Sequence, residues 1–450
     1  MAYRGASAAF PEHSVGAYRA AMEQGAQFVE CDVVLTKDLV PICRHESNIA
    51  DTTNVLLGAH RHGWGLGASS NGTQVFAADL TLAQIKQLRA VFPGTVPTAA
   101  TAAQAGADGE AKGQCDMDAA AGSCAAPWSG AAEPKAAGEG AAVARAETCK
   151  WDGATGGAAV GGGPAAYTPA CSESVPSGAD ELASPAYEVA TLEELIWMSM
   201  ASRGPAVGVA LHIQAAAWHN AHPVLQPRLA AASTTFEDIL LQLLNKYGYA
   251  AGPYGSEAWR QRPTYIMAFE AKSLQYLAQR TNAPLTLVLG PTIPDTGETW
   301  DSATSEEGLR RIATYAQSLA VARQSLLVPA GPAVAAVAEA AGEAGGDGGL
   351  AASPVLARMR QAGLQVFASV FKPAAGHLLP GAASWEQEIV PLLTAGEQLP
   401  GGGGDAEAAP AEGQEQKLLF SQRHALGIDG LFADSPGMLK QVYDKYACRD

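Results

Sequence analysis

Short apolar segments alternate with amphipathic ones along most of this chain, and this alternation limits the fold more than any other feature. Strand-like runs lie at 26–35, 40–45, 206–213, 264–269, 285–289, 325–329, 364–371 and 428–433. Helix-like segments, several of them with a Thr or Ser start and a Gly or Asn stop, lie at 13–25, 81–92, 191–204, 235–248, 271–282 and 309–320. Such alternation predicts a parallel sheet, and about eight strands predict an α/β fold of the (β/α)8 TIM-barrel type. An open doubly wound sheet is the alternative, but its G-x-G-x-x-G fingerprint is absent after the first strand.

Three low-complexity stretches interrupt this pattern. Residues 98–184 consist largely of Ala and Gly with few large apolar side chains, which predicts a disordered insertion. Residues 331–352 and 401–416 are predicted to be flexible loop insertions. The remaining segments, 1–97 and 185–450, are then expected to form one barrel domain together.

Charge and hydropathy exclude several classes of partner. The 450 residues include 29 Lys and Arg against 45 Asp and Glu, a net charge of −16. This balance argues against nucleic acid and anionic membrane surfaces, which require basic patches. No apolar run reaches the roughly 18 residues of a transmembrane helix, and no secretory signal is visible ahead of the first candidate motif. Seven cysteines without a C-x-x-C pair leave the redox compartment open, and localisation and oligomeric state stay unassigned.

Two carboxylates mark the strand at 26–35 as a candidate cation site. Glu30 and Asp32 are two residues apart, so on a strand they point to the same face. Apolar neighbours on both sides are typical of a buried parallel strand, where unpaired carboxylates are costly. Oxygen ligands of this kind suit Ca²⁺ or Mg²⁺, which is therefore the predicted cofactor.

Five further residues are candidates for the same site. A reversal through 36–41 would return His45 to the two carboxylates, and histidine is well suited to proton transfer near neutral pH. Arg4 offers a guanidinium that can clamp a phosphate, with Glu12 close by in sequence. His219 and His222 follow the strand at 206–213 and could approach the same mouth.

The first fifty-five residues resemble the glycerophosphodiester phosphodiesterases. They contain "YRGAS", "PEHS", "ECD", "TKD" and "RHE" in the order of that family's H-R-G-A-S, P-E-N/H-T, E-x-D, T-K-D-G and R-H-D/E pattern. Weaker similarity continues through "DLTLAQIKQLRA", "TLEEL", "LQVFASVF" and "LGIDGLFADSP". The features are of a plant or algal type, with some from the plant glycerophosphodiester phosphodiesterase-like branch.

The resemblance implies a barrel hydrolase that cleaves glycerophosphodiesters to glycerol 3-phosphate and an alcohol. By that likeness Glu30 and Asp32 bind the divalent cation, and His45 is one of a catalytic acid–base pair. Arg4 then contacts the phosphate, and Glu12 belongs to the substrate-binding mouth. The expected partner is a small glycerophosphodiester.

Several positions depart from the family pattern. Tyr3 stands where the family has its other catalytic histidine, so reduced activity is expected. His212 and Gln214 replace a glutamate that is a metal ligand and a lysine that contacts phosphate; His212 is taken as a candidate metal ligand and Gln214 as a candidate substrate contact. Leu39 replaces the glycine of T-K-D-G, which would strain a turn that requires a positive φ.

Two other interpretations stay open from the sequence. A degenerate, non-catalytic barrel that binds a phosphorylated ligand, in a cell-wall or regulatory role, would account for the departures. Only Met1, Ala2 and Tyr3 precede Arg4, whereas a barrel strand has about five residues, so a truncated first strand with exposed sheet edges is expected.

Overall fold

Residues 1–56, 74–93, 184–202, 206–330, 349–372, 377–395 and 427–447 are described by a computed structural model. They all fall in one compact unit, Met1–Ala99 with Ala183–Asp450. The predicted insertions at 98–184 and 401–416 lie outside the described residues, apart from Ser184, and so does 331–348. No helix in the described ranges is both long enough and apolar enough to cross a membrane.

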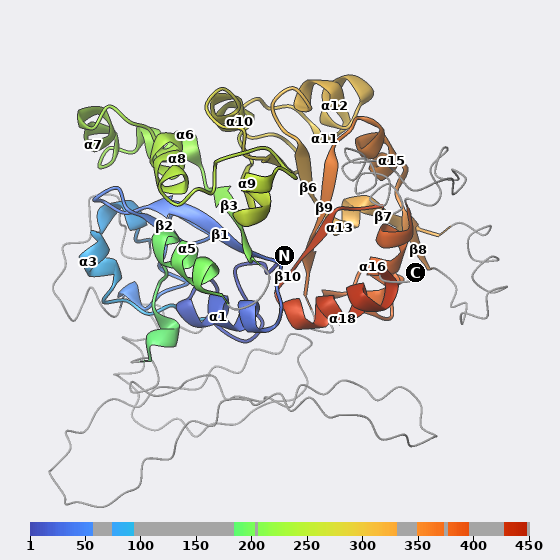
Figure 1. Cartoon of the computed structure of the whole chain (residues 1–450), viewed down its shortest axis with the longest axis horizontal. Helices are drawn as coiled ribbons and strands as arrows, with labels where there is room; N and C mark the ends of the chain where they lie inside the picture. The colour runs from blue at the N-terminus through green and yellow to red at the C-terminus, as the bar shows by residue number, and fades with distance from the viewer. Residues whose placement is uncertain are drawn as a thin grey trace, which may run out of the picture. The chain divides into compact units, whose positions relative to one another are not determined.

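Strands and helices alternate as predicted (Figure 1). The strands are β1 (Phe28–Leu35), β2 (Pro41–Cys43), β3 (Gly208–Ile213), β4 (Thr264–Ala268), β5 (Leu285–Leu289), β6 (Ser318–Ala322), β7 (Leu327–Pro329), β8 (Leu350–Ala352), β9 (Gln365–Phe371) and β10 (Gly430–Ala433). The helices are α1 (Val15–Glu23), η1 (Ala77–Asp79), α3 (Leu82–Ile85), η3 (Pro185–Tyr187), α5 (Leu192–Ala201), α6 (Ala216–Ala221), α7 (Gln226–Ala231), α8 (Phe236–Lys246), α9 (Glu257–Gln261), α10 (Ala271–Ala278), α11 (Trp300–Ala303), α12 (Glu306–Ile312), α13 (Arg323–Leu326), α15 (Pro354–Gln361), α16 (Trp385–Thr394) and α18 (Pro436–Ala447).

Several helices begin where the sequence supplies a capping side chain. At α5 the Thr191 side chain accepts a hydrogen bond from the Glu194 backbone N–H, and the Glu194 side chain accepts one from the Thr191 N–H. This capping box satisfies two backbone donors that a helix start leaves unpaired. At α8, Thr235 caps the first turn, and Phe236 and Leu240 turn to the core.

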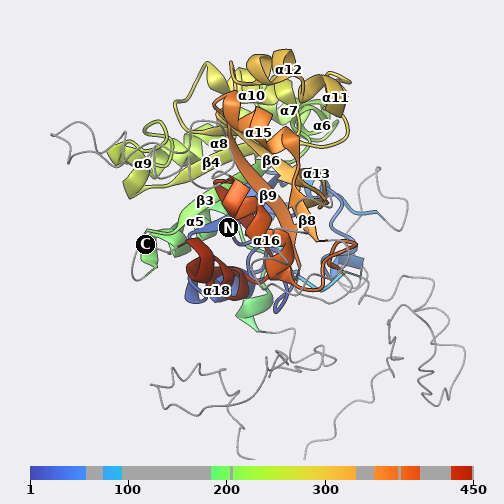
Figure 2. The same ribbon diagram turned by 90° about the vertical axis from the view of Figure 1, so that its right-hand side faces the viewer.

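The main sheet runs β10-β9-β6-β5-β4-β3-β1-β2, and all its pairs are parallel except β1 with β2. One residue closes this sheet into a ring: Ala2 bridges Val29 of β1 on one side and Ala433 of β10 on the other, both in parallel. The Ala2 N–H donates to the Phe28 carbonyl at 2.8 Å, and the Tyr3 N–H donates to the Ala433 carbonyl at 2.8 Å. Figures 1 and 2 accordingly show the N-terminus beside β10.

This closure confirms the barrel and rules out the open doubly wound sheet. The first strand is as short as expected. Its one bridging residue, Ala2, pairs with a strand on each side, so the predicted exposed sheet edges do not occur at Ala2. Two members of the ring differ from the sequence prediction. The run at 40–45 forms the antiparallel β2, and 325–329 spans the end of α13 and β7, so neither is a barrel strand.

Two segments were predicted wrongly. Residues 318–320 belong to strand β6, although the sequence pattern placed them in a helix at 309–320; α12 ends at Ile312. "SLAVA" is short and rich in alanine, so its burial between β5 and β9 overrides a propensity that favours a helix. The last residues of the predicted loop 331–352 form β8, which pairs antiparallel with β7.

Two apolar layers hold the barrel together. Buried side chains of five strands contact one another and fill its interior: Ala210, Tyr265, Met267, Ala320, Phe367 and Phe432. The larger layer lies between the outer face of the sheet and the helices, and includes Val29, Cys31 and Val33 of β1. Each fully buried large side chain contributes roughly 1.5–3 kcal/mol, so these layers supply most of the stability that positions the site.

Strand β1 turns into β2 through a tight reversal. Val33 pairs with Cys43 and Leu35 with Pro41, as the sequence predicted for the segment that leads to His45. Leu39 adopts φ 63°, so the turn does require the left-handed conformation that glycine tolerates best. Leucine is retained there because its side chain packs against the outer core layer.

His219 is a structural residue of α6. Its ring is fully buried, 4.7 Å from the Phe236 ring, and its Nδ1 lies 3.1 Å from the Ala215 carbonyl. Burial lowers the pKa of His219 to about 4, partly opposed by the hydrogen bonds to the Ala215 and Gln214 backbone. His219 therefore stays neutral in the folded protein and lies outside the candidate site.

The turn that follows Arg4 generates the first prediction. Gly5 has φ 84°, and a Cβ there would lie 2.7 Å from the Ala17 backbone carbon. Gly5→Ala should lower the free energy of unfolding by about 3 kcal/mol, because left-handed strain and a backbone clash add together. Gly248→Ala is the matched control, since Gly248 has φ 76° but open space around it, and should cost about 1 kcal/mol. Equal losses in urea unfolding would contradict the close approach.

The second prediction concerns the pH dependence of stability. Below the unfolded pKa of about 6.5 the unfolded chain binds a proton at His219 that the folded protein excludes until about pH 4. Protonation of His219 in the unfolded chain should therefore lower the free energy of unfolding by about 3 kcal/mol as pH falls from about 6.5 to about 4. His219→Asn should flatten the slope of unfolding free energy against pH, whereas the exposed His377→Asn should leave it unchanged. An unchanged slope in His219→Asn would contradict the assignment.

Candidate functional site

Strand β1 directs Glu30 and Asp32 into the barrel. Val29, Cys31 and Val33 belong to the outer core layer, so the alternating residues Glu30 and Asp32 point to the interior. Both carboxylates are buried, at 3% and 1% exposure. The sequence prediction that the two share one face is therefore confirmed.

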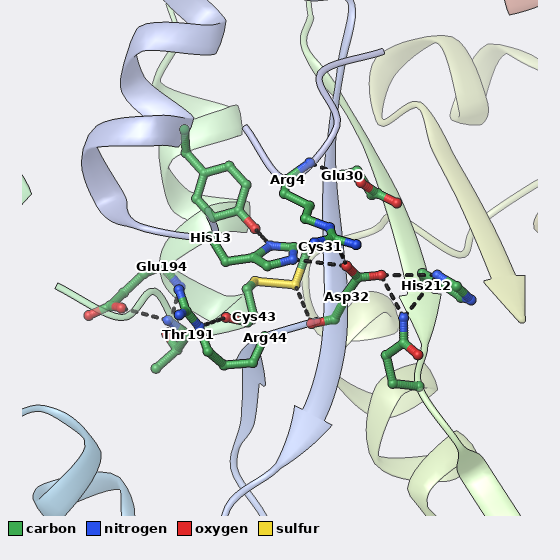
Figure 3. Close-up of a disulfide and its surroundings, with 12 residues drawn as sticks. Arg4, His13, Glu30, Cys31, Asp32, Cys43, Arg44, Thr191, Glu194 and His212 are labelled. Carbon is green, nitrogen blue, oxygen red and sulfur yellow. Dashed lines mark hydrogen bonds and ion pairs between the residues drawn. A yellow bond between two sulfur atoms is a disulfide. The ribbon is translucent and has the colours of Figure 1, made fainter. Parts of the chain in front are cut away.

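Strand β3 places His212 directly beside Asp32. The two residues are register partners in the parallel β1–β3 pair, and His212 Nδ1 lies 2.9 Å from Asp32 Oδ1 (Figure 3). One possible ligand atom each from Glu30, Asp32 and His212 lies within 4.8 Å of the others. The structure thus brings together the three residues predicted as metal ligands, although they come from strands about 180 residues apart in sequence.

Asp32 is the most heavily contacted acid of the site. Its Oδ2 lies 2.9 Å from His13 Nε2, and its Oδ1 accepts a hydrogen bond of 2.8 Å from the Gln214 amide. Arg4 Nε approaches Oδ2 at 3.5 Å. Burial alone would raise the pKa of Asp32, but the hydrogen bonds from His13 and His212 outweigh it and hold this pKa well below its usual range. Asp32 is therefore ionised.

Glu30 has the opposite electrostatic character. Burial, followed by repulsion from Asp32, raises the pKa of Glu30 well above its usual range. Its Oε2 accepts one hydrogen bond, from the Arg4 backbone N–H at 2.9 Å. A cation beside Glu30 would favour the ionised form, and His212 Nε2 is buried without a hydrogen-bond partner in the described residues. The donor set of two carboxylates and an available imidazole nitrogen therefore fits a divalent cation.

Arg4 connects these acids to the mouth of the barrel. It adopts φ 58° ahead of Gly5, a left-handed pair of residues that turns the chain from the bridge at Ala2 toward the pocket. Its guanidinium donates to Glu12 Oε2 at 2.5 Å, donates to the Tyr3 hydroxyl and lies 4.4 Å from the centre of the Tyr3 ring. Burial would raise the pKa of Glu12, but Arg4 lowers it overall, so the pair is ionised.

A pocket of about 160 Å³ opens next to this pair. Tyr3, Arg4 and Glu12 line one part of it, and Lys372 and Asp434, at the ends of β9 and β10, line another. Sequence reasoning missed Lys372 and Asp434. Their signal was their place directly after two predicted strands, since the carboxyl ends of barrel strands meet at one face.

His45 forms no hydrogen bond or ion pair with Glu30 or Asp32 among the described residues. The β1–β2 hairpin brings the backbone back, because the Arg44 N–H donates to the Asp32 carbonyl at 2.7 Å. The His45 side chain is one-third exposed, and its Nδ1 lies 3.1 Å from Glu46 Oε1. Within the described residues no contact joins His45 to Glu30 or Asp32, so its catalytic role stays a prediction.

His13 is the functional neighbour that the sequence prediction overlooked. It is fully buried between Asp32 and the Tyr18 hydroxyl, which lies 2.7 Å from its Nδ1. Burial lowers the pKa of His13, partly opposed by Asp32, so the ring is neutral. These contacts fit a tautomer with the proton on Nε2, donated to Asp32, and Nδ1 accepting from the Tyr18 O–H. The signal was the pair Glu12–His13 close behind Arg4.

A disulfide ties this strand to its hairpin partner. Cys31 lies between Glu30 and Asp32 but faces outward, and it is bonded to Cys43 of β2 (Figure 3). The loop it closes spans 12 residues, and a disulfide of that size contributes roughly 3 kcal/mol by restricting the unfolded chain. The sequence did not predict this pairing, because seven cysteines allow many.

Comparison with known proteins agrees with this site. Residues 4–121 match the model of the "Glycerophosphoryl diester phosphodiesterase family". The chain is 26% identical to the glycerophosphodiester phosphodiesterase GDPD6 of Arabidopsis thaliana over 324 residues, which cover 70% of this chain and 62% of the relative. It is 36% identical to the glycerophosphodiester phosphodiesterase of Bacillus subtilis over 90 residues, 20% of this chain and 25% of that protein.

Among solved structures, the glycerophosphodiester phosphodiesterase of Thermotoga maritima is similar with a TM-score of 0.38 and 13% identity, over 98% of this chain and 96% of that one. The chain spans less than two thirds of the length of the curated relatives named above. The family model covers Arg4, Glu12, Glu30, Asp32 and His45, the residues on which the sequence resemblance rested. The resemblance is therefore confirmed for this segment, which is similar to the glycerophosphodiester phosphodiesterases.

Proposed function

We propose that this protein hydrolyses glycerophosphodiesters to glycerol 3-phosphate and an alcohol with the help of a divalent cation. The observation that carries the proposal is the cluster of Glu30, Asp32 and His212 within 4.8 Å. Arg4, which contacts both Glu30 and Asp32, also lines the pocket, and these three residues lie in the segment that matches the phosphodiesterase family. Relatives that carry this activity in their names support the substrate class.

Glu30, Asp32 and His212 would hold the cation. When bound, Ca²⁺ or Mg²⁺ would neutralise the phosphodiester and the charge that develops on its oxygens. Asp32 orients His212 by accepting at Nδ1, which leaves Nε2 as the free ligand atom. Imidazole is a softer ligand than these ions prefer, so His212 would be the weakest of the three donors.

Arg4 would bind the phosphate from the pocket side. Glu12 holds the guanidinium in place by accepting a hydrogen bond of 2.5 Å, and the Tyr3 ring packs against the guanidinium. A held guanidinium presents its remaining N–H groups in fixed directions, which suits recognition of phosphate oxygens. Gln214 would act more indirectly, because its amide already donates to Asp32.

His45 would donate a proton to the departing alcohol oxygen, the role that the resemblance assigns to it. Tyr3 is not a matching base: burial, partly opposed by Arg4, raises the pKa of Tyr3 above its ordinary value, so the phenol stays protonated. Loss of one proton-transfer group typically costs about 10²–10⁴ in rate. We therefore expect an active enzyme with reduced turnover.

A non-catalytic barrel that binds a phosphorylated ligand is the less favoured alternative. The contacts of Asp32 support this alternative, because His13, His212 and Gln214 already satisfy both of its carboxylate oxygens without a cation. Glu30 argues against this alternative, because its carboxylate accepts a single hydrogen bond from the described residues and its ionised form would be stabilised by a cation.

Metal binding provides the third prediction. Glu30→Gln and Asp32→Asn should each weaken Ca²⁺ or Mg²⁺ binding at least 10–100-fold in isothermal titration calorimetry, because each removes a charged oxygen ligand. Glu257→Gln is the control, since Glu257 is exposed on α9, and should leave the dissociation constant unchanged. Unaltered binding in Glu30→Gln would remove Glu30 from the site.

Turnover provides the fourth prediction. With glycerophosphocholine and Ca²⁺ or Mg²⁺, the protein should release glycerol 3-phosphate, and Tyr3→His should raise kcat by about 10²–10⁴. Tyr3→Phe keeps the ring beneath Arg4 and should change kcat only a few-fold. Absence of product from the wild type, with Tyr3→His active, would identify the native chain as the non-catalytic barrel. Absence of product from both would exclude the proposed reaction.

A further inference from the structure

Asp434 is an acid of the pocket that no role above uses. It follows Ala433, the last residue of β10, and lines the pocket with Tyr3, Arg4 and Lys372. Its backbone is fixed on both sides: its N–H donates to the Phe371 carbonyl at 3.2 Å, and its carbonyl accepts from the Ala8 N–H at 3.1 Å. The side chain is half-buried and held at the carboxyl end of the barrel.

Among the described residues, no other side chain forms a hydrogen bond or ion pair with the carboxylate of Asp434, although its own backbone N–H helps to lower its pKa. Glu12 accepts from Arg4, whereas the side chain of Asp434 forms no ion pair with the described residues, and its buried Oδ1 has no hydrogen-bond partner among them. An unsatisfied buried carboxylate oxygen costs free energy unless a ligand or water supplies a proton to it. A hydrogen-bond donor in the pocket, such as a water molecule, would satisfy this oxygen.

The charges around Asp434 suit proton transfer near neutral pH. Burial raises the pKa of Asp434 to about 6, and Lys372 and Arg323 limit that rise. Lys372 follows β9 and enters no ion pair within the described ranges. Arg323 of α13 is 2.6 Å from Glu388 and donates to the carbonyls of Val370 and His377, on either side of Lys372 in sequence. Tyr3, Arg4 and Glu12 face the pocket from the N-terminal segment.

We propose that the Asp434 carboxylate acts as the general base of this chain in place of the histidine that Tyr3 replaces, less effectively than that histidine would, and takes a proton from the water that attacks the phosphodiester. The inference rests on the proposed function. The water oxygen forms a bond to phosphorus while the bond from phosphorus to the alcohol oxygen breaks. The electron pair of the broken bond leaves with the alcohol oxygen, which accepts a proton from the acid. The proton from water passes to Asp434 and then to solvent.

Lys372 has two effects in this arrangement. Lys372 and Arg4 are both cations of the pocket lining. A phosphate in the pocket would therefore be attracted by one cation near the start of the barrel sequence and by one near its end. The charge of Lys372 also keeps the carboxylate of Asp434 ionised at neutral pH. Lys372→Met should therefore raise KM and move the acid limb of kcat/KM to higher pH.

The fifth prediction tests Asp434 itself. With glycerophosphocholine and the cation that supports most activity, Asp434→Asn should lower kcat about 10²–10⁴-fold, change KM little and abolish the loss of activity near pH 6. Formate should partly restore Asp434→Ala, because a small carboxylate can occupy the space that the substitution opens. Asp79→Asn is the matched control: Asp79 is also a buried acid with an unpartnered oxygen, but it does not line the pocket. It should keep the wild-type pH profile.

The possible outcomes separate this inference from the proposed function. An active wild type with an unchanged kcat and acid limb in Asp434→Asn would overturn the inference alone. A wild type and Tyr3→His protein that are inactive with every cation would overturn both. If Asp434→Asn fails to fold, as judged by circular dichroism and Tm, the Lys372→Met pH profile decides, because an unshifted acid limb there contradicts the role of Asp434.

Discussion

The ionised carboxylate of Asp32 inside the barrel is the constraint on which the site depends. A buried charge is costly, and here it is stabilised by two imidazoles, an amide and, at longer range, a guanidinium. The donors come from three parts of the chain: His13 precedes α1, His212 lies in β3 with Gln214 directly after the strand, and Arg4 follows the bridge at Ala2. The register of β1 with β3 is therefore an electrostatic requirement as much as a matter of packing, since a slip of one residue would move His212 to the outer face.

The contrast between neighbouring acids shows how one strand can prepare two chemistries. Asp32 and Glu30 share a face of β1, yet their pKa values shift in opposite directions. Hydrogen-bond donors lower the pKa of Asp32, whereas burial and the charge of Asp32 raise the pKa of Glu30. Asp434 differs from both, because it lies at the rim with cations nearby and forms no hydrogen bond or ion pair with another side chain in the described residues. Acids whose pKa values are separated by their surroundings in this way are typical of acid–base and cation-binding sites.

The sequence predicted the barrel and the inward pair Glu30 and Asp32 because both follow from short-range patterns: strand alternation and side-chain period. It failed where tertiary contact decides. Strand β6 was assigned to a helix because its alanine-rich segment carries no strong strand signal. The place of Asp434 in the pocket depends on the ring closing at Ala2, which no local pattern reports. His13 was visible in the sequence, but its burial against Asp32 depends on how α1 packs on β1.

The bridge at Ala2 also sets the order in which the site can be assembled during synthesis. The backbone contacts that close the ring join residues more than 400 positions apart, so they form only after β10 has been made. Until then Tyr3 lacks the Ala433 carbonyl that accepts from its N–H, although Ala2 can already pair with β1 and Arg4 can already contact Glu30 and Glu12. Loop closure over such a separation is entropically costly and slow. The nascent protein therefore holds the acidic part of the site for most of its synthesis, and the pocket lined by Tyr3, Lys372 and Asp434 is complete only after β10 has been made.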